Sequence, residues 1–130
     1  MIRFFICGSA LRGQPDHAVL EEARFLGEAR TESRYRIHSV DDVHPAVYAV
    51  ERDGVAIAGE LYELTHAQYL ALLAREPPNL YEDDVALEDG SHARAMLFPR
   101  GLVEERGCAD ISSYGGWAAY KRALGDRHSG

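Results

Sequence analysis

Two Asp-Gly pairs, Asp53-Gly54 and Asp89-Gly90, constrain the fold of this chain more than any other feature. Each pair separates two short apolar segments, and such a dipeptide favours a β-hairpin because Asp and Gly tolerate the positive φ angles of tight turns. The strands expected on either side of these turns are 45–51, 55–64, 85–88 and 92–98. A large part of the fold is therefore expected to be antiparallel sheet.

Local patterns predict the remaining elements. Residues 2–7 are apolar and rich in aromatic side chains, and residues 28–40 alternate weakly, so both segments are expected to be strands. Thr65 and Gln68 have the spacing of a capping box at the start of a helix. The expected helices are 16–24, 66–75 and 117–124, and the expected loop is 99–107. The pattern predicts an α+β fold, a small mixed, mostly antiparallel β-barrel with flanking helices.

Length and composition limit the class of protein. With 130 residues the chain is expected to form a single domain at 1–124, followed by a polar tail at 125–130. A net charge of -7 argues against a nucleic-acid partner, since polyanions are bound by basic surfaces. No apolar run approaches the ~20 residues that cross a bilayer, so no membrane partner is expected.

The cysteines and histidines provide no framework for disulfides or metals. Cys7 and Cys108 are too few for a disulfide scaffold, so we expect them to be unbonded to each other in a cytoplasmic protein. The six histidines are scattered without the spacing of metal ligands. We therefore expect neither a metal nor an organic cofactor.

The segment that begins at Cys7 is the first candidate site. A strand that ends in a glycine turn leaves backbone N–H groups unpaired, and such a concavity binds a carboxylate or another oxyanion. Gly8 has no Cβ and lets a ligand approach the main chain, while Ser9 adds a hydroxyl. The candidate substrate-binding residues are Cys7, Gly8, Ser9, Ala10 and Leu11. The alternative is a tight turn that binds nothing.

Glu76 is the candidate catalytic residue. It follows the helix predicted at 66–75, where a carboxylate opposes the negative end of the helix dipole, so its position needs another explanation. A partly buried glutamate with a raised pKa is a usable general base near neutral pH. The alternative is a solvated glutamate that pairs with Arg75 or another surface arginine. Cys7 is also a conceivable nucleophile, but the sequence places no histidine beside it, which favours a small buried thiol.

Residues 5–13, Phe-Ile-Cys-Gly-Ser-Ala-Leu-Arg-Gly, resemble the opening signature of the gamma-glutamylcyclotransferase-like superfamily. Residues 28–37 and 110–120 are similar to a narrower group, the C-terminal domain of allophanate hydrolases. The second of these segments, Asp-Ile-Ser-Ser-Tyr-Gly-Gly-Trp-Ala-Ala-Tyr, is the most specific motif in the chain. The resemblance covers nearly the whole sequence.

The resemblance implies a pocket at one mouth of the barrel, between residues 8–11 and Glu76. In the cyclotransferases the glycine loop holds the amino-acid head group, and the glutamate moves a proton while the substrate's own amine attacks its γ-carbonyl. In allophanate hydrolases the homologous domain acts downstream of an amidase-signature domain and assists the loss of carbon dioxide from a small carboxylated nitrogen compound. Neither activity implies a cofactor, because the nucleophile belongs to the substrate.

The chain departs from both groups. Cys7 replaces the tyrosine of the cyclotransferase signature, whereas Glu76 keeps the cyclotransferase acid at a position that is generally aliphatic in the allophanate-hydrolase domain. Residues 45–49 lack the arginine of that domain's Pro-Gly-Leu-Val-Arg segment. We therefore expect a small-molecule enzyme, a C–N lyase, hydrolase or transferase, that acts on a small carboxylated amide or urea-like compound with Glu76 as general acid/base. The alternative is a non-catalytic, ligand-binding accessory subunit of an amidase-type hydrolase.

Overall fold

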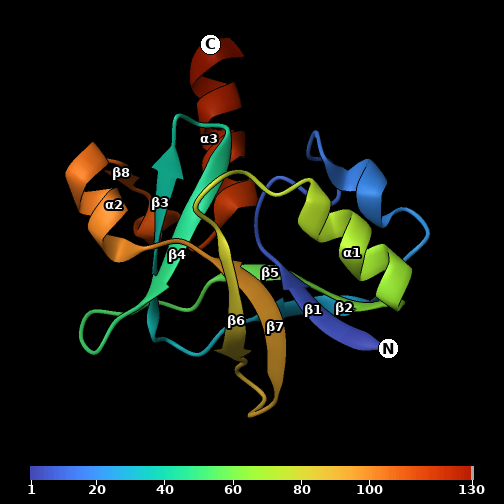
Figure 1. Ribbon diagram of the computed structural model, residues 1–130. Coiled ribbons are helices and arrows are strands. Elements are labelled where there is room, and N and C mark those ends of the chain that lie inside the picture. The colour runs from blue at the N-terminus through green and yellow to red at the C-terminus, as the bar shows by residue number, and fades with distance from the viewer. Residues whose placement is uncertain (130) are drawn as a thin grey trace.

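In the computed structural model, which describes residues 1–129 and their side chains as far as Gly125, the chain forms two β-sheets with helices around them (Figure 1). The strands are β1 (Ile2–Ile6), β2 (Arg24–Arg30), β3 (Tyr35–Val40), β4 (His44–Ala49), β5 (Ala58–Leu64), β6 (Tyr81–Ala86), β7 (His92–Leu97) and β8 (Ala109–Asp110). The helices are α1 (His66–Ala74), α2 (Arg100–Arg106), α3 (Trp117–Ser129) and the short 3-10 helices η1 (His17–Leu20) and η2 (Ser112–Tyr114).

The larger sheet has five strands in the order β2-β5-β1-β7-β6. Its central strand β1 pairs antiparallel with β5 and parallel with β7. Just after β2 and β6, an isolated bridge between Thr31 and Leu87 brings the two edges of the sheet together at one point. The predicted α+β class, with mixed and mostly antiparallel strands, is confirmed. The term barrel describes it only loosely, because the sheets do not close.

The smaller sheet, in the order β4-β3-β8, overturns the first predicted hairpin. The partner of β4 is β3, across the turn at Asp41 and Asp42, and β5 pairs instead with β1 and β2. Gly54 has a different role from the one expected. A Cβ at this position would lie 2.6 Å from the carbonyl oxygen of Ser33, so glycine is required by close backbone packing between the two segments.

Three further elements differ from the sequence prediction. Residues 28–40 contribute to two strands in different sheets, and residues 16–24 contain η1 rather than an α-helix. The expected loop at 99–107 contains α2, which begins after Pro99 and ends at Gly107 with a left-handed φ of 62°. Proline before the first turn and glycine after the last are ordinary helix boundaries, so the same residues that favour a loop also mark the two ends of this helix.

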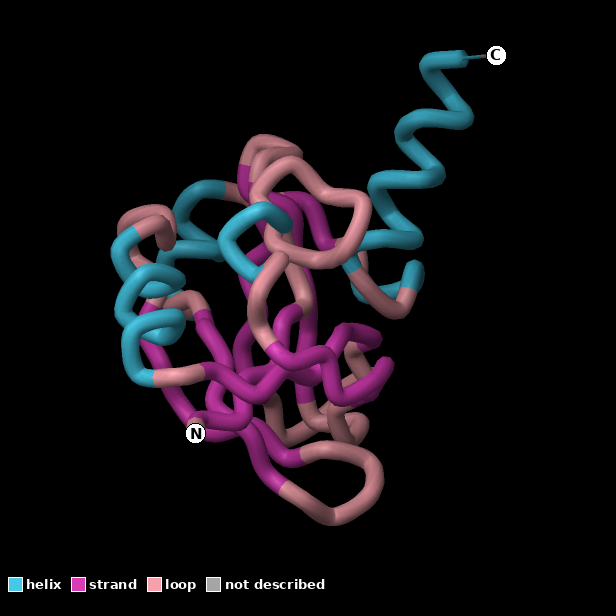
Figure 2. The backbone as a smooth tube through the Cα atoms, turned by 90° about the vertical axis from the view of Figure 1, so that its right-hand side faces the viewer, coloured by secondary structure: helices cyan, strands magenta, loops and turns pink. Residues whose placement is uncertain are grey.

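Helix α3 also extends beyond its predicted end. It continues to Ser129 and projects away from the sheets, as the view in Figure 2 shows. Gly130, the last residue of the expected tail, lies outside the described residues. In the described part of the chain, no helix combines the length and the apolar character that a bilayer span requires.

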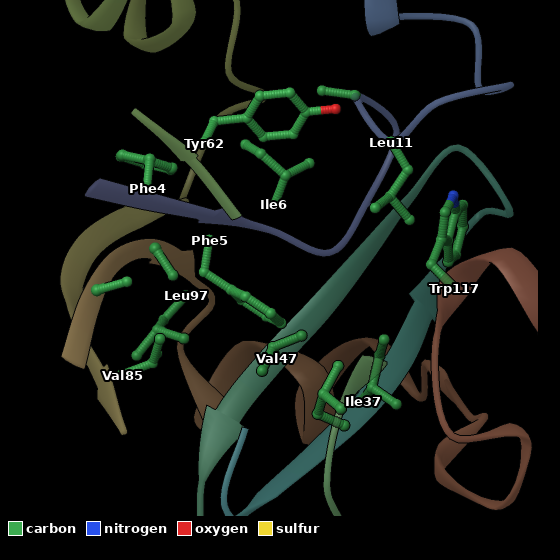
Figure 3. Packing of buried hydrophobic residues seen from close by; sticks show 14 of the residues in the cluster. Phe4, Phe5, Ile6, Leu11, Ile37, Val47, Tyr62, Val85, Leu97 and Trp117 are labelled. Carbon is green, nitrogen blue, oxygen red and sulfur yellow. The ribbon is translucent and has the colours of Figure 1, made fainter. Parts of the chain in front are cut away.

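The larger of two hydrophobic clusters joins the two sheets (Figure 3). Phe5 of β1 and Val47 of β4 are buried in the same cluster as Trp117, which begins α3. Full burial of a side chain of this size contributes about 1.5–3 kcal/mol. The core therefore fixes the C-terminal end of β1, from which the loop at Gly8 emerges.

The elements around α1 follow the local sequence signals. The Thr65 hydroxyl accepts a hydrogen bond from the backbone N–H of Gln68 at 3.1 Å, and the Gln68 side chain accepts one from the backbone N–H of Thr65 at 2.8 Å. This capping box confirms the predicted start of the helix. The backbone N–H of Glu76 donates to the carbonyl of Leu73 at 3.2 Å, so Glu76 directly follows the last turn. The hairpin of β6 and β7 is also confirmed.

Candidate functional site

A small cavity lies beside the C-terminal end of β1, with a volume of about 50 Å³. Residues 7–10 of the loop and Glu76 line it together, although they are far apart in the sequence. Leu11, the remaining candidate, does not line this cavity. It is buried in the core and borders a different groove. The volume suits a group of a few non-hydrogen atoms rather than a peptide.

The loop at Gly8 leaves two backbone donors available. The carbonyl oxygens of Gly8 and Ser9 accept hydrogen bonds from Leu11 and Asp16, at 3.1 and 2.9 Å. Within the described residues, the backbone N–H groups of Ser9 and Ala10 donate to no backbone carbonyl. Backbone donors without a protein partner bind water or a ligand, so this pair suits a carboxylate or another oxyanion.

Gly8 is required by packing. A Cβ at this position would lie 2.8 Å from Cδ of Pro45 in β4, which is closer than real side chains approach. The glycine therefore lets the smaller sheet come into contact with the end of β1. This contact, rather than the approach of a ligand, fills the space beside the Gly8 Cα.

Glu76 is half-buried, and no ion pair involving its carboxylate occurs among the described residues, including the alternative pairing with Arg75. Burial and, to a lesser extent, repulsion from the Asp16 carboxylate raise the pKa of Glu76 from 4.5 to about 7. With such a pKa, the acid and its conjugate base are both populated near neutral pH. Both forms are needed by a group that accepts a proton in one step and returns it in another.

The Cys7 thiol also lines the cavity. Burial and, to a lesser extent, the negative charge of Glu76 raise the pKa of Cys7 from 9.0 to about 12. The thiolate is the nucleophilic form of cysteine, so Cys7 remains protonated and unreactive at neutral pH. Cys7 and Cys108 are both free thiols. These observations favour the interpretation of Cys7 as a small buried thiol.

Comparison with known proteins assigns the family. The profile of the allophanate hydrolase C-terminal domain matches residues 2–122. This chain belongs to that family. A urea amidolyase from Saccharomyces cerevisiae is 25% identical over 135 residues, which cover 98% of this chain. The chain spans about 7% of the length of the curated relatives that it matches.

Solved structures agree with the family assignment. The structure of c4763, a uropathogenic E. coli-specific protein, has a TM-score of 0.85 at 30% identity, covering 92% of this chain and 94% of that chain. Kluyveromyces lactis allophanate hydrolase has a TM-score of 0.86 at 24% identity, covering 95% of this chain and 21% of that chain. A gamma-glutamyl cyclotransferase structure has the same fold, with a TM-score of 0.54 at 17% identity over 75% of this chain and 66% of that chain. The predicted resemblance to both groups is confirmed.

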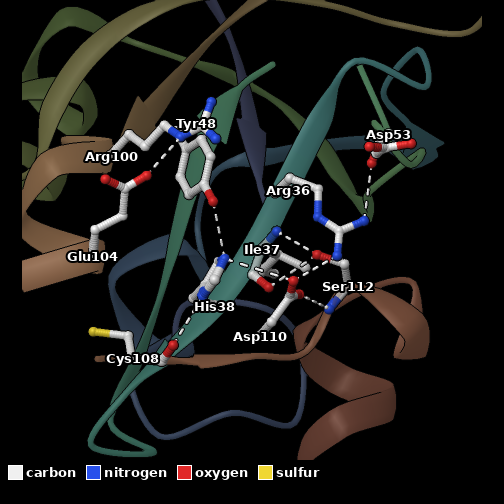
Figure 4. Close-up of polar contacts among 10 residues, drawn as sticks. All are labelled: Arg36, Ile37, His38, Tyr48, Asp53, Arg100, Glu104, Cys108, Asp110 and Ser112. Atoms are coloured by element: carbon white, nitrogen blue, oxygen red, sulfur yellow. Dashed lines mark hydrogen bonds and ion pairs between the residues drawn. The ribbon is translucent and has the colours of Figure 1, made fainter. Parts of the chain in front are cut away.

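The most specific segment of this allophanate hydrolase C-terminal domain, residues 110–120, lies largely in a structural network (Figure 4). The Ser112 hydroxyl accepts from the backbone N–H of Ile37 at 3.0 Å and donates to its carbonyl at 3.2 Å. Asp110 forms an ion pair with Arg36 and accepts from the backbone N–H of Ser112. Although burial alone raises the pKa of Asp110, the hydrogen bonds from Ser112 and Arg36 lower it to about 2. These contacts hold β8 and η2 against β3.

A second, larger groove of about 510 Å³ borders the other end of this segment. Its one deeply buried acid, Glu60, accepts hydrogen bonds from Nε and the backbone N–H of Arg12, at 2.8 and 3.1 Å, and from the Tyr62 hydroxyl at 3.0 Å. Both carboxylate oxygens are therefore in use. In the described part of the chain, no group of three or more His, Cys, Asp or Glu side chains could hold a metal ion.

His44 lines the cavity of Glu76 and was missed in the sequence. It is the first residue of β4, between Val43 and Pro45, and nothing in that context separates it from the other histidines. The β3–β4 hairpin brings it to the cavity, and this was the pairing that the Asp53-Gly54 signal obscured. Only the three-dimensional fold reveals it.

Proposed function

We propose that this allophanate hydrolase C-terminal domain is a small-molecule enzyme that breaks a C–N bond in a small carboxylated amide or urea-like compound. The observation that carries the proposal is the state of Glu76, a half-buried acid with a pKa of about 7 in a cavity shared with residues 7–10. A surface carboxylate keeps a pKa near 4 and cannot hold a proton at neutral pH. Glu76 is therefore the proposed general acid/base.

The chemistry follows from the groups around the cavity. The backbone N–H groups of Ser9 and Ala10 bind a carboxylate of the substrate and fix its orientation. When an N-carboxylated compound loses carbon dioxide, the C–N bond breaks and its electron pair goes to the nitrogen, which takes a proton from protonated Glu76. Water then returns a proton to the Glu76 carboxylate. A positioned acid of this kind typically contributes about 100- to 10,000-fold in rate.

Substrate assays test the proposal. The protein is incubated with gamma-glutamyl dipeptides and, separately, with N-carboxylated or urea-derived amides, while 5-oxoproline, ammonia and carbon dioxide are followed. We expect turnover in the second group only, because Cys7 stands where the cyclotransferases have a phenol. Rapid release of 5-oxoproline that disappears in Glu76→Gln would replace the proposal with a plain cyclotransferase activity.

A second candidate function is an accessory subunit of an amidase-type enzyme. The matched region is 7% of the yeast urea amidolyase and 21% of the Kluyveromyces lactis allophanate hydrolase chain, so in these relatives the domain is joined to much larger enzymes. Size-exclusion chromatography with a separately produced amidase-type hydrolase tests this candidate. Co-elution, together with silence toward every substrate, favours the accessory role. We place either function in the cytoplasm, where free thiols such as Cys7 and Cys108 persist.

A further inference from the structure

His44 is a rigidly held, deeply buried polar group on the wall of the Glu76 cavity. Only 9% of the residue is exposed. Its ring packs against Phe98, with centroids 6.0 Å apart and planes inclined by 47°. Its backbone is fixed in the ladder with β3, where His44 pairs with Val40. The imidazole therefore has a defined orientation before any ligand arrives.

The hydrogen bond at one ring nitrogen defines the state of the other. Nδ1 of His44 lies 3.0 Å from the carbonyl oxygen of Pro45. A carbonyl oxygen can only accept, so Nδ1 carries a proton, and in the neutral form of the ring Nε2 is an acceptor with a lone pair. Nε2 has no hydrogen-bond partner among the described residues. Glu82 Oε1 is the one buried side-chain nitrogen or oxygen atom without a partner in the described part of the chain, so Nε2 is accessible and can accept a hydrogen bond from water or from a ligand.

The residues that line the cavity thus carry complementary polar groups. The backbone N–H groups of Ser9 and Ala10 are donors that suit a carboxylate, whereas Nε2 of His44 is an acceptor that repels one. A ligand that satisfies both must carry an anionic oxygen at one end and an N–H donor at the other. We propose that His44 is a substrate-binding residue that selects the N–H group of a neutral amide or ureido end. This inference rests on the proposed function of the same cavity and narrows its substrate class.

The preference for an amide over a ketone of the same shape should be strong, although it depends on a single hydrogen bond to His44. A site built to hydrogen-bond an N–H group rejects an isostere without it, because the bound isostere displaces water from the acceptor and offers no donor in its place. His44 therefore distinguishes an amide from a methyl ketone of the same shape. Glu76, which supplies or removes the proton, is not required for this distinction.

Two isosteric ligand pairs test the inference. Oxamate and pyruvate differ only in NH₂ against CH₃, and malonamate and acetoacetate repeat this difference at greater length. Dissociation constants are measured by calorimetry. We expect the amide of at least one pair to bind about 10-fold more tightly than its ketone, as one additional hydrogen bond provides. In His44→Phe, which keeps a ring against Phe98 but has no acceptor, we expect the ratio to fall to about one. His66→Phe, an exposed histidine outside the cavity, should keep the ratio.

The results of these binding measurements distinguish the role of His44 from the proposed cleavage of a C–N bond. An unchanged amide preference in a folded His44→Phe, or equal or absent binding of all four probes to the unaltered protein, overturns the role of His44. A His44-dependent preference without turnover of any substrate supports the binding residue and removes the proposed reaction. Nitrogen-15 NMR of the unaltered protein gives a test that needs no variant. An Nδ1–H tautomer for His44 is expected, and an Nε2–H tautomer contradicts the inference.

Discussion

Glu76 and Glu60 are both withdrawn from solvent, yet their pKa values are shifted in opposite directions. Burial raises the pKa of each carboxyl group. At Glu60, hydrogen bonds from Arg12 and from Tyr62 outweigh burial and hold the pKa below its ordinary value. At Glu76 no ion pair opposes burial among the described residues, and the pKa rises to about 7. The comparison teaches that burial alone does not make an acid reactive, because its partners decide whether it holds a proton.

The largest expected effect is the loss of activity when the acid with the raised pKa, Glu76, is replaced. Glu76→Gln should lower turnover by about 100- to 10,000-fold, since the amide can neither accept nor supply the proton. Glu105→Gln, which removes an exposed acid of α2, should retain full activity. Steady-state rates with the best N-carboxylated or urea-derived substrate provide the measurement. Equal rates for Glu76→Gln and the unaltered protein would remove Glu76 from the reaction.

The second prediction concerns stability against pH. The folded state holds the Glu76 proton up to about pH 7, whereas the unfolded chain releases it near 4.5. The stabilisation is therefore complete below pH 4.5 and is lost as the pH rises to about 7. Relative to Glu76→Gln, the unaltered protein should lose about 2–3 kcal/mol of unfolding free energy between pH 4.5 and pH 8. Urea denaturation across this range measures the difference, and parallel curves would contradict the raised pKa.

The third prediction assigns Glu60 to the fold. Glu60→Gln removes the charge that Arg12 contacts and should lower the unfolding free energy by about 1.5–3 kcal/mol, the range for hydrogen bonds to charged groups. Glu63→Gln is the matched control, because its pair with the exposed Arg24 should contribute no more than about 1 kcal/mol. Urea denaturation at pH 7 compares the two variants. A larger loss in the control would reverse the assignment.

The smallest effect is expected at Cys7. Cys7→Ala should leave turnover within about threefold of the unaltered protein, because the thiol is protonated at neutral pH and supplies no nucleophile. Iodoacetamide should correspondingly label it slowly, as detected by mass spectrometry. Complete loss of activity in a folded Cys7→Ala would shift the chemistry from Glu76 to the thiol.

Elements specified by neighbouring residues were predictable from the sequence. The capping box of Thr65 and Gln68 and the hairpin at Asp89-Gly90 each depend on contacts a few residues apart. The partners of β5 are strands distant in the sequence. The Asp53-Gly54 pair has the sequence pattern of a hairpin turn, but Gly54 is needed for close packing against Ser33. Long-range pairing of this kind leaves little trace in local patterns.

The candidate site likewise contains residues that the sequence predicts and residues that only the fold reveals. The glycine loop and Glu76 were proposed from their positions at the ends of a strand and a helix, and the structure brings residues 7–10 and Glu76 to one cavity. Leu11 was included because it is adjacent in sequence, but the chain turns it into the core. His44 could not be predicted, since its place in the cavity depends on the β3–β4 hairpin. The tautomer of its ring depends on a backbone carbonyl that only the fold positions.

The contact of Gly8 with Pro45 places the cavity across the boundary between the two sheets. The loop and Glu76 belong to the larger sheet and its helix, whereas His44 belongs to β4 in the smaller one. A ligand held from both sides is a removable crosslink between them. By mass action it stabilises only conformations in which the sheets are together. Amide hydrogens of β3 and β4 should therefore exchange more slowly when the cavity is occupied, although no ligand atom touches most of them.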